Sequence, residues 1–363
     1  MFLINWPRRG LNMSLHVMDL PKRVVVGNGT LKYLSNYIGD LSGEESNQIA
    51  IITGPTLSRT LVPNLISNLE EFQYKIYIAN KPTWEELKRI EFNIFHDGDP
   101  KIIIGFGGGK SIDIAKLISF RNGKIFISIP TSPSHDGIAS LFASLKGYKK
   151  AYSMKAVPPS LVLVDMDIIA KSPKRLIASG VGDSLAKFTA VKDWRLAHEM
   201  TGEYYGEYAS NLALMSAKLV LQKISGISEG DPDSLRTLIE ALISTGVAAG
   251  IAGSSRPCSG SEHLFSHALD LYVNDEYSFH GEKVGIGTIM MAYLHELDWE
   301  GIREAIRIVG GPVTYKDLRM SKEDILKGII YAKKVRPERY TILNKFNINK
   351  EFAESLAKNT GVI

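Results

Sequence analysis

Cysteine is nearly missing from this sequence: Cys258 is the one cysteine among 363 residues. A single thiol excludes an internal disulfide framework, and it excludes a zinc site built from cysteines. Both absences suit a reducing compartment, so we expect a cytoplasmic protein in which Cys258 is a buried structural thiol.

Long apolar runs and blocks of like charge are also missing. No apolar stretch approaches the roughly 20 residues that span a bilayer, and Met1 to Leu20 lacks the continuous apolar core of a signal peptide. The 43 basic and 39 acidic residues are spread along the chain and give a net charge of +4. We therefore expect neither membrane insertion nor nucleic-acid binding, while the mild basicity favours an anionic substrate.

What the sequence does contain is enough apolar material for two domains. Its 363 residues, 44% hydrophobic and 23% charged, have the composition of a globular protein and suit two cores with a cleft between them. Residues 1–12 carry no regular pattern, so we predict a flexible extension there, with Met1 or Met13 as the start.

Residues 13–170 alternate short β-branched runs with helical patterns. The runs predict six buried strands, at Arg23–Val26, Ile49–Thr53, Tyr74–Ile78, Ile102–Ile104, Ile125–Ile129 and Leu161–Val164. Helical patterns between them cover Gly29–Ile38, Leu57–Leu69, Trp84–Phe95 and Ser111–Ser119. This alternation predicts an α/β, Rossmann-like dinucleotide-binding domain with a mostly parallel sheet. One interruption, Ala139–Met154, alternates around Lys146-Gly147 and predicts an inserted hairpin.

Residues 171–363 show helical patterns only, which predicts an all-α domain with the boundary between Asp167 and Pro173. The predicted helices are Lys174–His198, Tyr204–Ile224, Asp233–Ala252, Ser261–Tyr272, Gly281–Leu294, Trp299–Ile308 and Ser321–Val335. Chemistry is expected in the cleft between the two domains.

Three consecutive glycines follow the fourth predicted strand, in the segment Gly105 to Lys116. Glycines let backbone amides approach a pyrophosphate, and the N-terminus of the next helix adds a partial positive charge. We therefore predict that cofactor phosphates bind at Gly107, Gly108, Gly109, Lys110 and Ser111. Ser111 could instead cap the helix, and a glycine-rich turn without a ligand is the alternative for the whole segment. The spacing matches neither G-x-G-x-x-G nor G-x-x-x-x-G-K-S/T, so a different nucleotide fold is indicated.

The loop after the fifth predicted strand, Pro130 to Asp136, is rich in hydroxyl groups and lies at the same edge of the predicted sheet. Open α/β sheets bind ligands at that edge, so Thr131 and Ser134 could hydrogen-bond the cofactor. A solvated turn rich in serine and proline accounts equally well for the local sequence.

One carboxylate and several histidines in the second half suggest a metal site. Asp183, in Gly180-Val181-Gly182-Asp183, is predicted near a helix start, where it could also be a cap. His263 and His267 lie at i and i+4 on one helix face, and His280 opens the segment His280-Gly281-Glu282-Lys283. A lone histidine is more often a satisfied polar side chain, but one carboxylate and two imidazoles form a three-ligand open site that suits zinc above iron(II) or manganese.

These motifs resemble the iron-type alcohol dehydrogenase and dehydroquinate synthase superfamily and, over nearly the whole chain, its archaeal sn-glycerol-1-phosphate dehydrogenases. The segments that carry the resemblance are Gly107 to Asp113, Ser134 to Gly137, Gly180 to Asp183, Ser255 to His263 and His280 to Val284. The stretch R-P-x-S-G-S-E-H, from Arg256 to His263, is the most specific of them.

The resemblance implies a dehydroquinate synthase-like fold and the reversible reduction of dihydroxyacetone phosphate to sn-glycerol 1-phosphate by NAD(P)H, for archaeal membrane lipids. One zinc ion per subunit would polarise the C2 carbonyl, held by Asp183, His263 and His280. Asp136, His267 and Asp183 would contact the substrate and serve catalysis. The dinucleotide would contact Gly107, Gly108, Gly109, Lys110, Ser111, Ile112, Asp113, Thr131, Ser132, Pro133, Ser134 and Ser140.

Several assignments stay open at this point. The product alkoxide needs a proton donor of near-neutral pKa, and His267 or a zinc-ordered water is expected. Arg256, Lys187 and Lys283 are candidates for the substrate phosphate, and each could instead form a structural ion pair. A homodimer or larger even assembly is implied by resemblance alone.

Three other functions compete with this one. A glycerol dehydrogenase acting on unphosphorylated glycerol or dihydroxyacetone would share the glycine turn and the metal site. A noncatalytic dinucleotide-binding protein would have no need of the metal ligands. A dehydroquinate synthase is disfavoured because its Asn-x-Gly-His type segment has no counterpart at Ser259 to His263.

Overall fold

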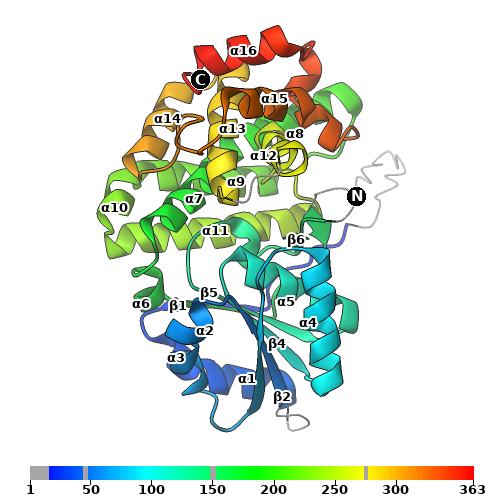
Figure 1. Ribbon diagram of the computed structural model, residues 1–363, viewed down its shortest axis with the longest axis vertical. Helices are drawn as coiled ribbons and strands as arrows, with labels where there is room; N and C mark the ends of the chain where they lie inside the picture. The colour runs from blue at the N-terminus through cyan, green and yellow to red at the C-terminus, as the bar shows by residue number, and fades with distance from the viewer. Residues whose placement is uncertain (1–15, 44–47, 148–152, 274–276) are drawn as a thin grey trace, which may run out of the picture.

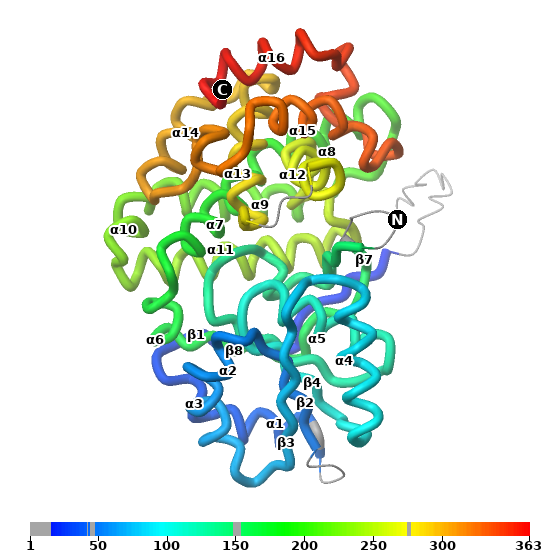
Figure 2. Tube along the Cα trace, in the orientation of Figure 1, coloured from blue at the N-terminus to red at the C-terminus, as the bar shows by residue number. Residues whose placement is uncertain are grey.

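The computed structural model describes residues 16–43, 48–147, 153–273 and 277–363. The predicted N-terminal extension, residues 1–12, lies outside these ranges. Figure 1 shows an α/β half that contains the sheet and a second half made of helices, which together form an elongated molecule. In Figure 2 the green helices α6 (Met166–Ile169) and α7 (Lys174–Leu185) carry the chain from one half to the other.

A six-stranded sheet of order β1-β8-β5-β4-β2-β3 forms the first half, and all its neighbouring strands are parallel. The strands are β1 (Arg23–Gly27), β2 (Gln48–Thr53), β3 (Gln73–Ile78), β4 (Ile102–Gly107), β5 (Ile125–Pro130) and β8 (Leu161–Asp165). All six predicted strands are confirmed, and so is the α/β fold class. Alternate residues enter different cores, because Ile52 and Ile103 pack on one face and Ile51 and Ile104 on the other.

The helices of this half are η1 (Thr30–Tyr33), α1 (Leu34–Ser42), α2 (Leu57–Thr60), α3 (Val62–Ile66), α4 (Trp84–Asp97), α5 (Gly109–Asn122), η3 (Asp136–Ile138) and α6. The prediction of one helix over Leu57–Leu69 was wrong, because the chain forms two short helices there. Pro63 explains the break: it has no N–H to continue the first helix, and it occupies the first turn of the second.

The inserted hairpin consists of β6 (Phe142–Ser144) and β7 (Ser153–Lys155), which pair antiparallel in a separate two-stranded sheet. These strands confirm the predicted hairpin, although residues 148–152 of its connection lie outside the described ranges. Backbone hydrogen bonds from Lys146 N to Pro82 O and from Trp84 N to Lys146 O attach the hairpin to the start of α4.

The second half is all-α, as predicted. Its helices are α7, α8 (Lys187–Thr201), α9 (Glu207–Gln222), α10 (Ile224–Glu229), α11 (Pro232–Ala252), α12 (Ser261–Tyr272), α13 (His280–Leu294), α14 (Trp299–Ile308), α15 (Lys322–Val335), η4 (Ile342–Lys345) and α16 (Lys350–Asn359). The predicted single helix Lys174–His198 is divided at Ala186, and α16 was not predicted.

Helix α11 is long and apolar enough to cross a membrane by length and composition, contrary to the expectation that no such run exists. Within the structure, 67% of its most apolar 18-residue window is buried. Figure 1 shows α11 lying between the sheet and the remaining helices, as expected for the core helix of a folded domain.

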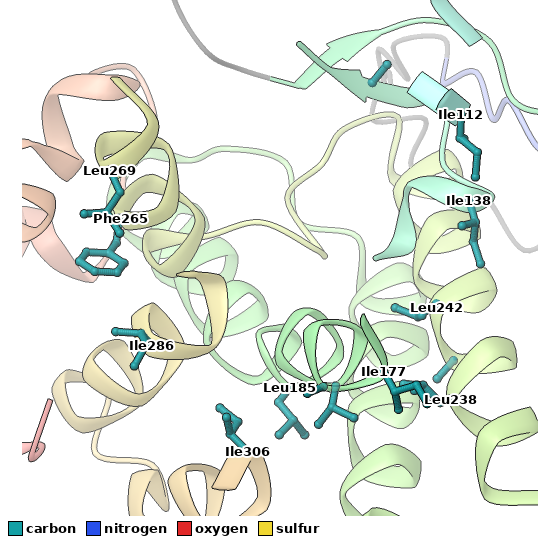
Figure 3. Packing of buried hydrophobic residues seen from close by; sticks show 14 of the residues in the cluster. Ile112, Ile138, Ile177, Leu185, Leu238, Leu242, Phe265, Leu269, Ile286 and Ile306 are labelled. Carbon is teal, nitrogen blue, oxygen red and sulfur yellow. The ribbon is translucent and has the colours of Figure 1, made fainter. Parts of the chain in front are cut away.

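One apolar core runs through both halves (Figure 3). It includes Ile112 of α5 and Ile138 of η3 together with Leu242 of α11, Ile177 of α7 and Ile286 of α13. Because these side chains pack continuously, the helices that carry the polar candidates are fixed relative to the carboxyl edge of the sheet.

Candidate active site

A cleft of about 1330 Å³ opens along the carboxyl edge of the sheet and is lined by both halves. From the α/β half it receives the glycine turn and the Thr131 to Asp136 loop, and from the helical half His263, His267 and His280. In the sheet, Gly107 pairs with Pro130, so the two predicted cofactor loops leave it side by side. This juxtaposition places a candidate nucleotide site beside a candidate metal site.

The glycine turn connects β4 directly to α5. Gly107 has φ 148°, a backbone conformation that favours glycine, and α5 begins at Gly109 with Gly108 as its N-cap. Ser111 lies inside the first turn, so the alternative that it caps α5 is wrong. Gly108 provides no side-chain cap, which suits the binding of an external anion at this helix start.

Most of the predicted cofactor residues line the cleft. They are Gly108, Gly109, Lys110, Ser111, Asp113, Thr131, Ser132, Ser134 and Ser140. Gly107, Ile112 and Pro133 do not line it; Ile112 is fully buried in the apolar core, and Pro133 presents its carbonyl oxygen to Gly180. Asp113 also has a structural contact, since Ser144 N donates to its Oδ2 at 3.0 Å and so joins α5 to β6.

Three helices converge on the predicted metal ligands. Asp183 lies in the last turn of α7, His263 in the first turn of α12, and His280 is the first residue of α13. One ligand atom from each lies within 4.8 Å of the other two. The placement of Asp183 at a helix start was wrong, because α7 begins nine residues earlier, at Lys174. A carboxylate and two imidazoles at this separation fit a zinc ion.

A buried carboxylate orients His263. Glu262 Oε1 lies 2.8 Å from His263 Nδ1, which leaves Nε2 facing Asp183 Oδ1 at 3.4 Å. Glu262 is itself held by Gly260 N at 2.6 Å and by Thr189 Oγ1 at 2.7 Å. A carboxylate behind a ligating histidine fixes the ring and its tautomer, so Glu262 supports the metal site although the sequence interpretation gave it no role.

Asp136, Asp183 and Lys187 form a buried charged network beside the triad. Lys187 Nζ lies 2.9 Å from Asp136 Oδ2 and 3.1 Å from Asp183 Oδ1, and Asp136 N donates to Asp183 Oδ2 at 2.8 Å. Burial raises the pKa of Asp183, but Lys187 and His263 outweigh it and hold that pKa well below its ordinary value. Burial likewise lowers the pKa of Lys187, and Asp136 and Asp183 raise it above its ordinary value. The network therefore keeps Asp183 in the anionic form that a cation needs.

His267 lies one helical turn beyond His263, with its ring centroid 6.0 Å from that of His280. It is 4% exposed and lines the cleft. Burial and the neighbouring His263 lower the pKa of His267 to about 3, which favours the neutral imidazole. It can still hydrogen-bond a ligand through a ring N–H.

All three basic candidates form ion pairs, and they differ in whether they line the cleft. Lys187 belongs to the network above, and Arg256 pairs with Glu203 and donates to Tyr340 O at 2.9 Å; neither lines the cleft. Lys283 does line it, with its Nζ 2.6 Å from Asp270 Oδ1.

His135 is a cleft residue to which the sequence gave no role. It is the N-cap of η3, and its ring lies against Gly109 of the glycine turn. A histidine in an irregular loop leaves no periodic signal, and its position next to Asp136 was the only hint in the sequence.

Comparison with known proteins agrees with this geometry. Residues 25–173 match the family described as iron-containing alcohol dehydrogenase. The chain is 49% identical to the glycerol-1-phosphate dehydrogenase of Hyperthermus butylicus, over 96% of this chain and 99% of that protein. It is 46% identical to the one of Sulfolobus acidocaldarius, over 97% and 100%; the names of both give NAD(P)+ as the cofactor. Among solved structures, a probable glycerol dehydrogenase from Sinorhizobium meliloti has the same fold, with a TM-score of 0.77 at 19% identity over 96% of this chain and 100% of that one.

Proposed function

The chain belongs to the glycerol-1-phosphate dehydrogenase family, and from this membership we propose that it reversibly reduces dihydroxyacetone phosphate to sn-glycerol 1-phosphate with NAD(P)H. The proposal rests on the 49% identity to the Hyperthermus butylicus protein. The matched region covers 96% of the chain and so includes the cleft residues of both halves. The product would form the glycerol backbone of archaeal membrane lipids, made by a cytoplasmic enzyme that assembles as a homo-oligomer.

The proposed metal is one zinc ion per subunit, held by Asp183, His263 and His280, whose ligand atoms lie within 4.8 Å of one another. When bound, zinc supplies a Lewis acid that polarises a carbonyl group, and NAD(P)H supplies the hydride. Lys187 keeps Asp183 anionic through their contact of 3.1 Å, and Glu262 fixes the ring of His263.

The proposed substrate contacts are Asp136, Asp183 and His267. Lys187 Nζ lies 2.9 Å from Asp136 Oδ2 and positions that carboxylate. His267 lies on the same face of α12 as His263, one turn further along. Lys283, one turn after His280 on α13, is our candidate for the substrate phosphate because it lines the cleft. His267 and an ordered water are the candidates for the proton donor.

A steady-state assay with two substrates tests this function. We expect NADPH oxidation with dihydroxyacetone phosphate to be far faster than with dihydroxyacetone, and the product to be the sn-1 enantiomer. A higher kcat/KM with dihydroxyacetone would favour a glycerol dehydrogenase. Tight dinucleotide binding without zinc and without turnover would favour a noncatalytic binding protein.

Replacement of His267 by Asn should lower kcat while zinc stays bound. The expected loss is about 10²-fold, the effect of removing a positioned side chain that assists proton transfer or hydrogen-bonds the reacting oxygen. Zinc content by mass spectrometry and steady-state kinetics measure the two effects separately. If H267N loses its zinc instead, His267 is a metal ligand, and its assignment as a substrate contact is wrong.

NADPH should be accepted alongside NADH. An acidic side chain after the second strand would bind the adenosine ribose and repel a 2′-phosphate. Here β2 ends at Thr53 and is followed by Gly54-Pro55-Thr56, with Arg59 nearby. Gly54, Pro55 and Thr56 line the cleft. The kcat/KM values for the two cofactors test this, and a preference for NADH above about a hundredfold, or ~3 kcal/mol, would contradict it.

A further inference from the structure

We infer that His135 binds phosphate: its Nε2–H donates a hydrogen bond to the pyrophosphate of a dinucleotide at the glycine turn. The inference rests on the proposed function for the identity of the ligand. It assigns a role to a side chain outside the predicted cofactor set, and three features of the loop support it.

Two glycines create the space that the His135 ring occupies. A Cβ at Gly109 would lie 2.1 Å from His135 Nε2, and a Cβ at Gly137 would lie 2.3 Å from its Cε1. Any other residue at either position would displace the imidazole. Gly109, the last glycine of the turn and the first residue of α5, must therefore lack a side chain to accommodate the His135 ring that packs on it.

The hydrogen bonding of the loop fixes which nitrogen carries the proton. Gly137 N donates to His135 Nδ1 at 2.8 Å, so Nδ1 is the acceptor and the ring N–H is at Nε2. Nε2 is fully buried and has no hydrogen-bond partner among the described residues. A buried N–H without a partner is uncommon, and in a cleft its expected partner is an acceptor on a ligand.

A second buried donor faces the same turn. Ser132 is 2% exposed, its Oγ also has no partner among the described residues, and this atom lies 3.8 Å from the Cβ position of Gly108. Ser132 Oγ and the His135 ring thus both lie near the start of α5, where no side chain caps the helix. Two donors beside a helix N-terminus match a group with several acceptor oxygens and negative charge, which a pyrophosphate is.

Binding of ADP-ribose tests the inference, because this probe contains the pyrophosphate without the nicotinamide. Calorimetry should show that His135→Asn lowers the affinity for ADP-ribose and the affinity for NADPH by the same factor, about tenfold or more. Asparagine can still accept from Gly137 N, so the loop keeps its internal bond while the Nε2–H is lost. His135→Gln places an amide N–H near the position of Nε2 and should recover most of the affinity.

The matched control is His96→Ala, at an exposed histidine on α4, and it should bind both ligands as the wild type does. Unchanged ADP-ribose affinity in H135N overturns the inference, and a loss confined to NADPH reassigns His135 to the nicotinamide end. The proposed function fails separately, if the wild type binds NADPH but does not reduce dihydroxyacetone phosphate.

Discussion

Replacement of His280 by Ala is expected to remove the metal and nearly all activity. His280 is one of the three ligands within 4.8 Å, and the two that remain cannot complete a three-ligand site. We expect zinc to be lost on dialysis and kcat/KM to fall by about 10³-fold or more, which corresponds to ~4 kcal/mol of transition-state stabilisation from a Lewis acid. Metal analysis and the dihydroxyacetone phosphate assay measure the two losses.

His280 suits this experiment better than Asp183 does. Asp183 is 1% exposed and compensates the buried Lys187, so its removal would also destabilise the fold, by about 3–5 kcal/mol. His280 is only partly buried, so H280A should fold and should bind NADPH with the affinity of the wild type. His96→Ala again serves as the control. Full activity in a zinc-free H280A protein would exclude a metal mechanism.

The sheet could be predicted because each strand is a short β-branched run, and parallel strands buried on both faces leave that signal. The resemblance named all three metal ligands, which the structure groups, but spacing alone could identify them only in part. The spacing of His263 and His267 shows that they share a helix face, but it does not show which of them binds a metal. Only the approach of α7, α12 and α13 groups His263 and His280 with Asp183 and leaves His267 one turn away.

The wrong helix boundaries have a common cause: glycine and proline occur at helix ends but also inside helices and at breaks between them. Gly180 and Gly182 suggested a helix start, but they lie inside α7, where each allows a close contact with another segment. Pro63 did mark a break, although the apolar pattern around it continued. His135 could not be found at all, because the space it fills depends on Gly109, more than twenty residues earlier in the chain.

Replacement of Gly281 by Ala is expected to destabilise the protein and loosen the metal site together. A Cβ at Gly281 would lie 1.9 Å from Ser179 O and 2.6 Å from Ser179 C, which are backbone atoms of α7 that cannot move aside. The contact is reciprocal: on α7, a Cβ at Gly182 would lie 2.3 Å from Gly281 O. These contacts bring α7 against α13 and so set the distance between Asp183 and His280.

The added methyl group must therefore push α7 and α13 apart. Overpacking of this kind costs about 3 kcal/mol or more, so thermal unfolding should show a melting temperature lower by at least about 5 °C. Zinc should also dissociate at a lower chelator concentration, because two of its ligands lie on the separated helices.

Gly285→Ala, on the same helix, is the matched control. The nearest atoms to its Cβ would be Ile306 Cδ1 at 3.4 Å and Gly182 Cα at 3.5 Å, which are ordinary contacts. Alanine is the better helix former by about 1 kcal/mol, so G285A should unfold at the wild-type temperature or slightly above it and keep its zinc. Equal stability and equal zinc retention in G281A and G285A would show that the glycine contact does not position the metal ligands.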